Sequence, residues 1–256
     1  MKEFSLAGKV AVITGGSRGI GRAIAECYAQ AGASVVVSSR KLSGVHEVAE
    51  GIKAAGGASL AVQAHTGKTE EIQTLVKQTV DHFGRLDILV NNAATNPHFG
   101  TLLAADEGQW DKILDTNAKG VFRTCQASVP YMQVQGGGKI INIISVSGLQ
   151  PTPGLGLYGV SKAAVFMLTK VLAVELGADN IQVNAIAPGV IKTRFSQLLW
   201  NTPQIADPIL SRLPLGRFGE PEEVAQMALF LAAPASDYVT GSIFVVDGGM
   251  SIGFGG

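Results

Sequence analysis

Residues 9–21 decide the fold of this chain, and they read Lys9-Val10-Ala11-Val12-Ile13-Thr14-Gly15-Gly16-Ser17-Arg18-Gly19-Ile20-Gly21. The first five residues are typical of a short buried strand, and a helical pattern follows the last glycine. Glycines between a strand and a helix allow a tight turn and a close backbone approach to a pyrophosphate, which the helix N-terminus attracts. The stretch therefore predicts a phosphate-binding loop of a dinucleotide site. Its spacing, Gly-x-x-x-Gly-x-Gly, differs from the general Gly-x-Gly-x-x-Gly fingerprint.

The end of the second expected strand favours a phosphorylated ribose. It reads Ser38-Ser39-Arg40-Lys41 and contains no carboxylate. A fold that prefers NAD places Asp or Glu near this point to bind the ribose 2′-hydroxyl, whereas arginine forms a two-pronged pair with a 2′-phosphate. Arg18, inside the glycine loop, is a second candidate for that contact. These residues predict NADP(H) over NAD(H); the alternative is that Arg40 and Lys41 only begin a solvated helix.

A serine, a tyrosine and a lysine form a candidate catalytic set. Tyr158 and Lys162 stand four residues apart, so they share one helix face, and Ser145 follows the apolar run Lys139 to Ile144. An ammonium beside the phenol is expected to lower the tyrosine pKa from about 10. The serine hydroxyl can hold a carbonyl oxygen while the tyrosine gives or takes the proton. The set predicts reduction of a C=O or oxidation of a CH–OH, although Tyr-x-x-x-Lys alone also arises by chance.

Strand and helix patterns alternate along the chain, which predicts a parallel sheet with helices on both faces. Strands are expected at 9–14, 34–38, 59–63, 86–90, 138–144, 181–186 and 242–246, and helices at 18–31, 43–55, 69–83, 106–116, 118–134, 157–177 and 221–232. No linker or repeat divides residues 1–256, so we expect a single α/β domain, a doubly wound seven-stranded sheet of the Rossmann type. Ligands bind beyond the carboxyl ends of such strands, where the glycine loop, Asn91-Asn92-Ala93-Ala94, Ser145 and Pro188-Gly189 are expected to meet.

Composition gives no support for a nucleic-acid or membrane partner. Lys+Arg and Asp+Glu are each 20, so the net charge is zero, and no apolar run of about 18 residues appears. Cys27 and Cys125 show no metal-binding pattern, so we interpret them as reduced thiols of a cytoplasmic protein. The four histidines show no ligand spacing, and no metal site is expected.

Together these motifs resemble the short-chain dehydrogenase/reductase family from end to end. The resemblance rests on Thr14-Gly-x-x-x-Gly-x-Gly21, Asn91-Asn92-Ala93, Asn117, Ser145, Tyr158-x-x-x-Lys162, Asn184 to Gly189 and Asp247-Gly248-Gly249. It implies that Asn117 completes the catalytic set by holding a water that links Lys162 to solvent. It also implies that Ile191 and Thr193 bind the nicotinamide carboxamide and that Asn92 and Ala93 pack against the adenosine ribose.

Within that family, four stretches look closest to the NADPH-dependent carbonyl and retinol reductases, namely Val35 to Lys41, His65 to Lys68, Asn92 to Pro97 and Ile191 to Trp200. Two departures from the family pattern stand out: His65 replaces the Asp that faces the adenine amino group, and Ala94 replaces a Gly. Members of this branch often end in a peroxisomal tripeptide, which Phe254-Gly255-Gly256 is not. Homotetramers are common in the family, with subunits paired through helices that match 106–134 and 157–177, where Arg123 is expected to contribute.

The segment at about 193–214 is expected to close over the substrate as a lid. An apolar pocket is expected from Ser147, Leu149, Leu155, Phe195, Leu199 and Trp200, each of which has an ordinary core or interface role as its alternative. Such a pocket favours hydrophobic ketones, aldehydes and α-dicarbonyls, while Arg194 leaves an anionic substrate open. Two other functions stay open: a 3-oxoacyl-thioester reductase, and a non-catalytic NADP(H)-binding protein.

Overall fold

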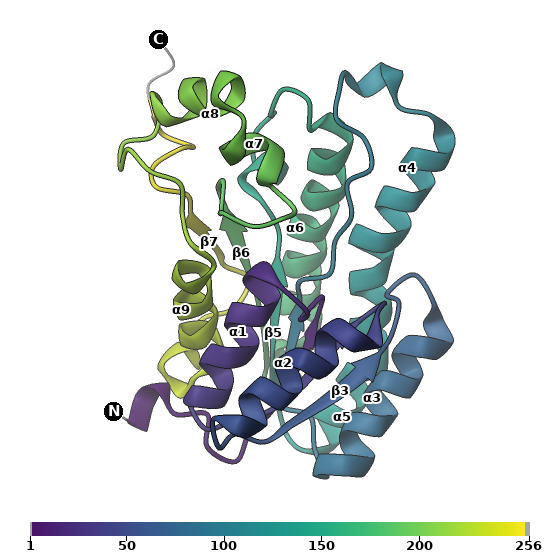
Figure 1. Ribbon diagram of the computed structural model, residues 1–256. Coiled ribbons are helices and arrows are strands. Elements are labelled where there is room, and N and C mark those ends of the chain that lie inside the picture. The colour runs from purple at the N-terminus through teal and green to yellow at the C-terminus, as the bar shows by residue number, and fades with distance from the viewer. Residues whose placement is uncertain (1, 254–256) are drawn as a thin grey trace.

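The apolar, β-branched runs form seven strands that all pair in parallel in the computed structural model, which describes residues 2–253 (Figure 1). They are β1 Val10–Thr14, β2 Ser34–Ser39, β3 Ser59–Gln63, β4 Ile88–Asn91, β5 Gly138–Ile143, β6 Ile181–Pro188 and β7 Ile243–Val246. Their order in the sheet is β3-β2-β1-β4-β5-β6-β7. The strand order reverses between β1 and β4, and a ligand crevice forms at such a point. The predicted doubly wound α/β fold is confirmed; the expectation about the terminal tripeptide concerns residues outside the described range.

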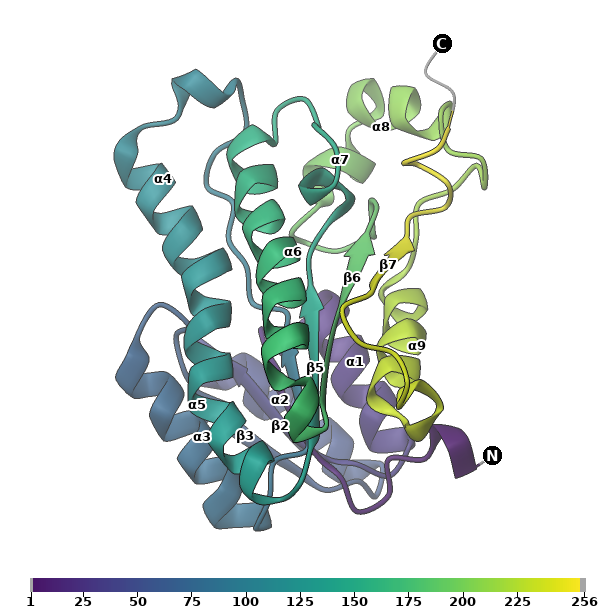
Figure 2. The same cartoon turned by 180° about the vertical axis from the view of Figure 1, so that it is seen from behind.

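All seven predicted helices are present, and two short helices occupy the predicted lid. The helices are α1 Gly19–Gln30, α2 Leu42–Ala54, α3 Thr69–Phe83, α4 Glu107–Leu114, α5 Gly120–Val134, α6 Gly156–Leu176, α7 Gln197–Asn201, α8 Pro203–Leu210 and α9 Pro221–Ala232. Where the sequence predicts a break after residue 116, a π-helix, Asp115–Lys119, joins α4 to α5. Figure 2 shows these three segments as one long rod along the face that also carries α6.

The helices divide into two layers, and side chains from the strands pack against both. Ala11 and Ile13 of β1 pack into the core beneath α1, α2 and α9, whereas Val12 packs into the core beneath α3, α5 and α6. This alternation follows from the two-residue period of a strand. Burial of each large apolar side chain stabilises the folded state by about 1.5–3 kcal/mol. On the first face, the Tyr28 hydroxyl of α1 donates to the Ala228 carbonyl of α9 at 2.8 Å. Both helix layers thus pack on a sheet whose parallel strands have their carboxyl ends at the same edge.

Among the described residues one helix, Gly156–Asp179, is long and apolar enough to cross a membrane by length and composition, with a mean hydropathy of 1.5. In the structure it is the sheet-packed helix α6, and its buried residues include Tyr158 and Lys162. Its opposite side carries exposed apolar residues, among them Val160, Met167 and Val174. The helix is therefore apolar nearly all round, although only one side faces the core.

Candidate active site

The glycine loop leaves the N-terminus of α1 open. Arg18 precedes the helix in an extended conformation, and its side chain does not cap the first N–H groups. Gly19 has a φ of +54°, a region that favours glycine, and a Cβ at this position would lie 3.0 Å from Cγ2 of Thr193. A Cβ at Gly21 would collide with the Asn92 side chain and the Gly15 carbonyl. Free helix N–H groups bordered by residues without side chains fit a pyrophosphate.

Asn92 fastens the end of β4 to this loop. Its side-chain amide donates to the carbonyls of Thr14 at 3.0 Å and Gly15 at 3.1 Å. The main-chain N–H groups of Asn92 and Ala93 both donate to the Thr14 hydroxyl, at 3.1 and 3.2 Å. The half-buried Ala94 follows directly. These contacts hold the predicted adenosine-side segment in a fixed position beside the predicted phosphate loop.

The residues predicted to bind the 2′-phosphate lie at the ends of β2 and β3. Arg40 and Lys41 are exposed, Ser38 is buried, and the Ser39 hydroxyl donates to the Lys41 carbonyl at 3.0 Å. Partial burial, and then the positive charge of Arg40, lower the pKa of His65, which places these two side chains near one another. Arg40 forms no ion pair with any residue in the range 2–253. A cation without a carboxylate partner at this position fits an anionic group on the ribose.

Ser145, Tyr158 and Lys162 come together beyond the end of β5. Ser145 accepts a hydrogen bond from the Ser147 N–H at 3.1 Å, which leaves its own proton free to be donated. Tyr158 and Lys162 lie on the buried side of α6, at 9% and 3% exposure. The Lys162 ammonium donates to the Ile143 carbonyl at 2.8 Å and lies 5.6 Å from the centre of the Tyr158 ring. The strand end therefore positions the lysine, and the helix positions the tyrosine.

The expectation that Lys162 lowers the pKa of Tyr158 is wrong for this structure. Burial raises the pKa of the phenol well above its usual value, and burial lowers the pKa of the Lys162 ammonium to about 8. Removal from water disfavours the charged form of both groups, and the ammonium bonds to a carbonyl rather than to the phenol. Tyr158 therefore keeps its proton at neutral pH, so it is equipped to act as an acid.

Asn117 occupies the π-helix between α4 and α5 and is fully buried. Its Oδ1 accepts from the Thr95 N–H at 2.8 Å, and its Nδ2 donates to the Thr95 carbonyl at 3.0 Å and to the Ser161 hydroxyl at 3.0 Å. Ser161 in turn donates to the Tyr158 carbonyl at 2.7 Å. The Asn117 side chain thus holds the first turns of α6, while the relay through a bound water stays a prediction.

Thr95 and Ser161 were missed by sequence reasoning. A small polar residue in an apolar helix is a weak signal for Ser161, because such a residue must find a partner when it is buried. No signal links Thr95 to Asn117, because their contact depends on the π-helix.

The Arg123 side chain is largely buried and joins two segments of the chain. Its side chain is 10% exposed and pairs with Asp115, 41% exposed, at 2.7 Å. The same guanidinium donates to the carbonyls of Thr66 at 3.3 Å and Asp115 at 3.2 Å. It therefore ties the loop after β3, which carries His65, to the π-helix that carries Asn117. The contribution of Arg123 to subunit pairing stays a prediction.

One exposed aromatic side chain lies beside Tyr158. Phe195 is 55% exposed, and its ring centre lies 5.8 Å from that of Tyr158. Leu149 is also exposed, and Ser147 is buried beside Ser145. A β-bridge between Gly100 and Leu155 joins the loop after β4 to the loop before α6. Of the predicted pocket residues, Phe195 is therefore the one that the structure places beside Tyr158.

The lid residues Leu199 and Trp200 pack into a small core of their own. This core contains Val190, Ala206, Leu213 and Phe218. The lid begins where β6 ends at Pro188, and the Gly189 N–H donates to the Val246 carbonyl at 3.0 Å. Ile191 is bridged to Gly219. The turn 191–193 is therefore held between the body of the protein and the lid.

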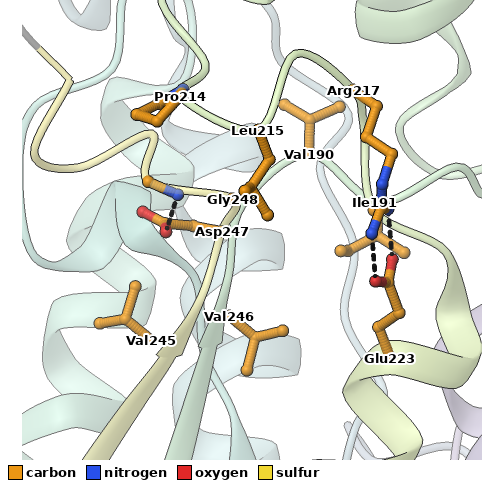
Figure 3. Close-up of a pocket in the computed structure, with 12 residues that line it drawn as sticks. Val190, Ile191, Pro214, Leu215, Arg217, Glu223, Val245, Val246, Asp247 and Gly248 are labelled. Atoms are coloured by element: carbon orange, nitrogen blue, oxygen red, sulfur yellow. Dashed lines mark hydrogen bonds and ion pairs between the residues drawn. The ribbon is translucent and has the colours of Figure 1, made fainter.

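A cavity of about 430 Å³ lies at the end of β7 (Figure 3). Ile191 forms part of its wall, and Arg217 pairs with Glu223 there at 2.7 and 2.8 Å. The lining residues do not include Ser145, Tyr158 or Lys162. The cavity therefore borders the turn predicted to bind the nicotinamide and lies apart from the predicted catalytic residues.

The glycine loop at the strand-order reversal and the buried Tyr-Lys pair define a nucleotide-dependent α/β oxidoreductase. A family model described as "Enoyl-(Acyl carrier protein) reductase" matches residues 15–251. The chain belongs to the short-chain dehydrogenase/reductase family.

Similar proteins include reductases and dehydrogenases. The chain is 45% identical over 244 residues to dehydrogenase/reductase SDR family member 4 of Oryctolagus cuniculus, covering 95% of this chain and 94% of that protein. It is 43% identical over 251 residues to a 3-oxoacyl-[acyl-carrier-protein] reductase of Thermotoga maritima, covering 96% and 99%. A gluconate 5-dehydrogenase from Burkholderia cenocepacia, solved with NADP and tartrate, superposes with a TM-score of 0.95 at 34% identity, covering 99% of each chain. A nicotinamide cofactor is therefore supported, while the two names that state a substrate differ in it.

Proposed function

We propose that this protein is an NADP(H)-dependent reductase of hydrophobic ketones, aldehydes and α-dicarbonyls. The observation that carries the proposal is the aromatic contact between the exposed Phe195 and the buried Tyr158. An exposed aromatic side chain beside a proton donor offers a flat apolar surface to a substrate whose carbonyl reaches the phenol. Leu149 and Phe99, both exposed, extend the apolar surroundings; Phe99 packs over Gly154 in the loop before α6.

Proton transfer is assigned to Tyr158. Bound NADPH would supply a hydride to the carbonyl carbon, and the oxygen that gains the electron pair must receive a proton. Ser145 has a free hydroxyl proton with which to hold that oxygen. Tyr158, whose pKa is raised by burial, is protonated at neutral pH and donates. Lys162, with a pKa of about 8, is close enough to neutrality to return a proton to the phenolate. The protonated phenol is the form that the reductive direction requires, since that direction consumes a proton.

Preference for NADP(H) is supported by Arg40 and by the relatives. Arg40 is exposed beside His65, and the Burkholderia structure contains NADP. A guanidinium pairs with phosphate through parallel hydrogen bonds. We therefore assign the 2′-phosphate to Arg40 and Lys41, with Arg18 at the edge of the pyrophosphate site.

A 3-oxoacyl-thioester reductase is the second candidate, because the Thermotoga relative carries that name at 43% identity. Both reactions use the same catalytic residues, so the substrate must distinguish them. NADPH oxidation is measured with an aromatic α-dicarbonyl, an aryl ketone, retinal and an acetoacetyl thioester, each repeated with NADH. Preferential turnover of the dicarbonyl or ketone with NADPH is expected. Turnover of the thioester alone would move the protein to acyl metabolism, and a preference for NADH would overturn the role of Arg40.

Replacement of the catalytic tyrosine tests the mechanism. Tyr158→Phe keeps the ring against Phe195 and removes only the phenolic hydroxyl. We expect turnover to fall by at least about 100-fold, while the affinity for NADPH changes by less than about threefold. Turnover by the variant within about tenfold of the parent would exclude Tyr158 as the proton donor. Loss of turnover would also exclude a purely non-catalytic binding protein.

We further propose a cytoplasmic homotetramer. The outward side of α6 presents Met167, 55% exposed, and Val174, 84% exposed, and a helix that is apolar all round is normally buried. A tetramer needs a second face, which the edge strand β7, with the exposed Val245, supplies. Sedimentation of Met167→Glu/Val174→Glu should give smaller particles than the parent. Ala54→Glu, at an exposed position of α2 on the opposite side of the sheet, should not. Unchanged particles would refute the α6 interface.

A further inference from the structure

The turn 191–193 is held by two lid residues that no catalytic assignment uses. The Trp200 indole N–H donates to the Thr193 carbonyl at 2.9 Å. The Ser196 hydroxyl donates to the Ile191 carbonyl, accepts from the Thr193 N–H at 3.3 Å, and contacts the Thr193 hydroxyl at 3.0 Å. A Cβ at Gly19 would lie 3.0 Å from the Thr193 methyl carbon, so the turn lies against the pyrophosphate loop.

Hydrogen-bond accounting fixes the direction of the contact between the two hydroxyls. A hydroxyl has one proton to donate and two lone pairs. The carbonyls of Ile191 and Thr193 can only accept, and the Thr193 carbonyl already accepts a hydrogen bond from the Trp200 indole. The Ser196 proton therefore goes to the Ile191 carbonyl, and the Thr193 hydroxyl must be the donor in its contact with Ser196.

Thr193 is then left with acceptor capacity only. One lone pair of its hydroxyl faces the Ser196 N–H at 3.3 Å, and the other remains for a ligand. Toward a nicotinamide, such an oxygen binds the N–H of the carboxamide and cannot bind its carbonyl. The carboxamide orientation would thereby be set by a residue that does not touch the cofactor.

We propose that Ser196 is a positioning residue that fixes the Thr193 hydroxyl as a hydrogen-bond acceptor, so that the site selects a primary carboxamide over ring substituents that cannot donate. The proposal rests on the proposed NADP(H) cofactor. It concerns whether the Thr193 hydroxyl donates or accepts toward the ligand, and it assigns to the first turn of the lid a role in holding the nicotinamide.

Equilibrium binding of two cofactors tests this proposal. NADP+ and its 3-acetylpyridine analogue differ only in that a methyl group replaces the carboxamide NH2, so all other contacts cancel in the ratio of their Kd values. Calorimetric titration of the parent should show tighter binding of NADP+ by about 2- to 10-fold, the range for one neutral hydrogen bond. Ser196→Ala should bring the ratio close to one, as should Thr193→Val. Ser196→Thr, which keeps the hydroxyl, should restore the ratio of the parent.

A lid serine outside the turn serves as the matched control. Ser211 is exposed, and its hydroxyl bonds only to the Pro208 carbonyl, at 3.1 Å, so Ser211→Ala should keep the ratio. An unchanged ratio in Ser196→Ala, or an equal weakening of both cofactors, would show a merely structural role and overturn the proposal. A parent that binds neither cofactor would instead refute the proposed NADP(H) function. A parent that turns over with NADPH but shows a ratio of one would refute the Ser196 proposal alone.

Discussion

The buried Lys162 makes the stability of this protein depend on pH in a direction that can be worked out. Burial lowers its pKa from 10.5 to about 8. The unfolded chain therefore binds more protons than the folded chain between these two values, and stability from this group rises as the pH rises through that window. Below about pH 8 the folded protein bears the full penalty, about 3 kcal/mol at 1.36 kcal/mol per pKa unit. Lys162→Met removes this dependence and keeps much of the side-chain volume.

Between about pH 7 and about pH 9.5, the parent should gain about 2 kcal/mol relative to Lys162→Met. The variant also leaves the Ile143 carbonyl without its partner, but this cost is the same at both pH values and cancels. The titration of Tyr158 cancels in the comparison, because both proteins keep this residue. The comparison therefore isolates the charge of one ammonium group.

Urea unfolding of both proteins at the two pH values measures this difference. The parent's stability minus the variant's should become more favourable as pH rises. If that difference stays constant within about 0.5 kcal/mol, Lys162 has an ordinary pKa, and its proposed ability to return a proton near neutrality loses its basis. If the parent's stability minus the variant's falls as the pH rises, the folded protein raises the pKa of Lys162 and the reasoning is refuted.

Three further outcomes follow from particular contacts. Gly21→Ala should destabilise the protein by at least about 2 kcal/mol and weaken NADPH binding, because its Cβ would meet Asn92 and the Gly15 carbonyl. Gly51 in α2 has open space around it, so Gly51→Ala should be neutral or stabilising by up to about 1 kcal/mol. Thermal or urea unfolding measures both effects. Arg123→Ala should lower the free energy of unfolding by about 2 kcal/mol, because it leaves the Asp115 carboxylate and two carbonyls without their donor. Lys53→Ala, which breaks an exposed ion pair, should change it by less than about 0.5 kcal/mol. Equal losses in the two variants would contradict the structural role of the Arg123 contacts. Arg40→Ser should weaken NADPH binding by at least about tenfold and leave NADH binding nearly unchanged in titrations; equal effects on the two cofactors would remove the 2′-phosphate assignment.

The sequence by itself determined the elements, the sheet and the grouping of the motifs. Strand runs such as residues 34–38 and helices such as 69–83 are local patterns, since apolar periodicity and glycine placement act over a few neighbouring residues. The Tyr158–Lys162 spacing is local in the same way, because a helix places such residues on one face. Parallel strand ends share one edge, so the motifs that follow them were expected to meet.

Only the tertiary structure decided how those groups are tuned. Burial of Tyr158 and Lys162 reversed the expected direction of the tyrosine pKa, because the cost of losing water depends on everything packed around both groups. Arg123 pairs inside the chain across segments that are distant in sequence. The hydroxyl of Thr193 takes its donor direction from Ser196 and, through the shared carbonyls, from Trp200. Hydrogen-bond direction, desolvation and partner choice are set by three-dimensional neighbours, so no residue spacing encodes them.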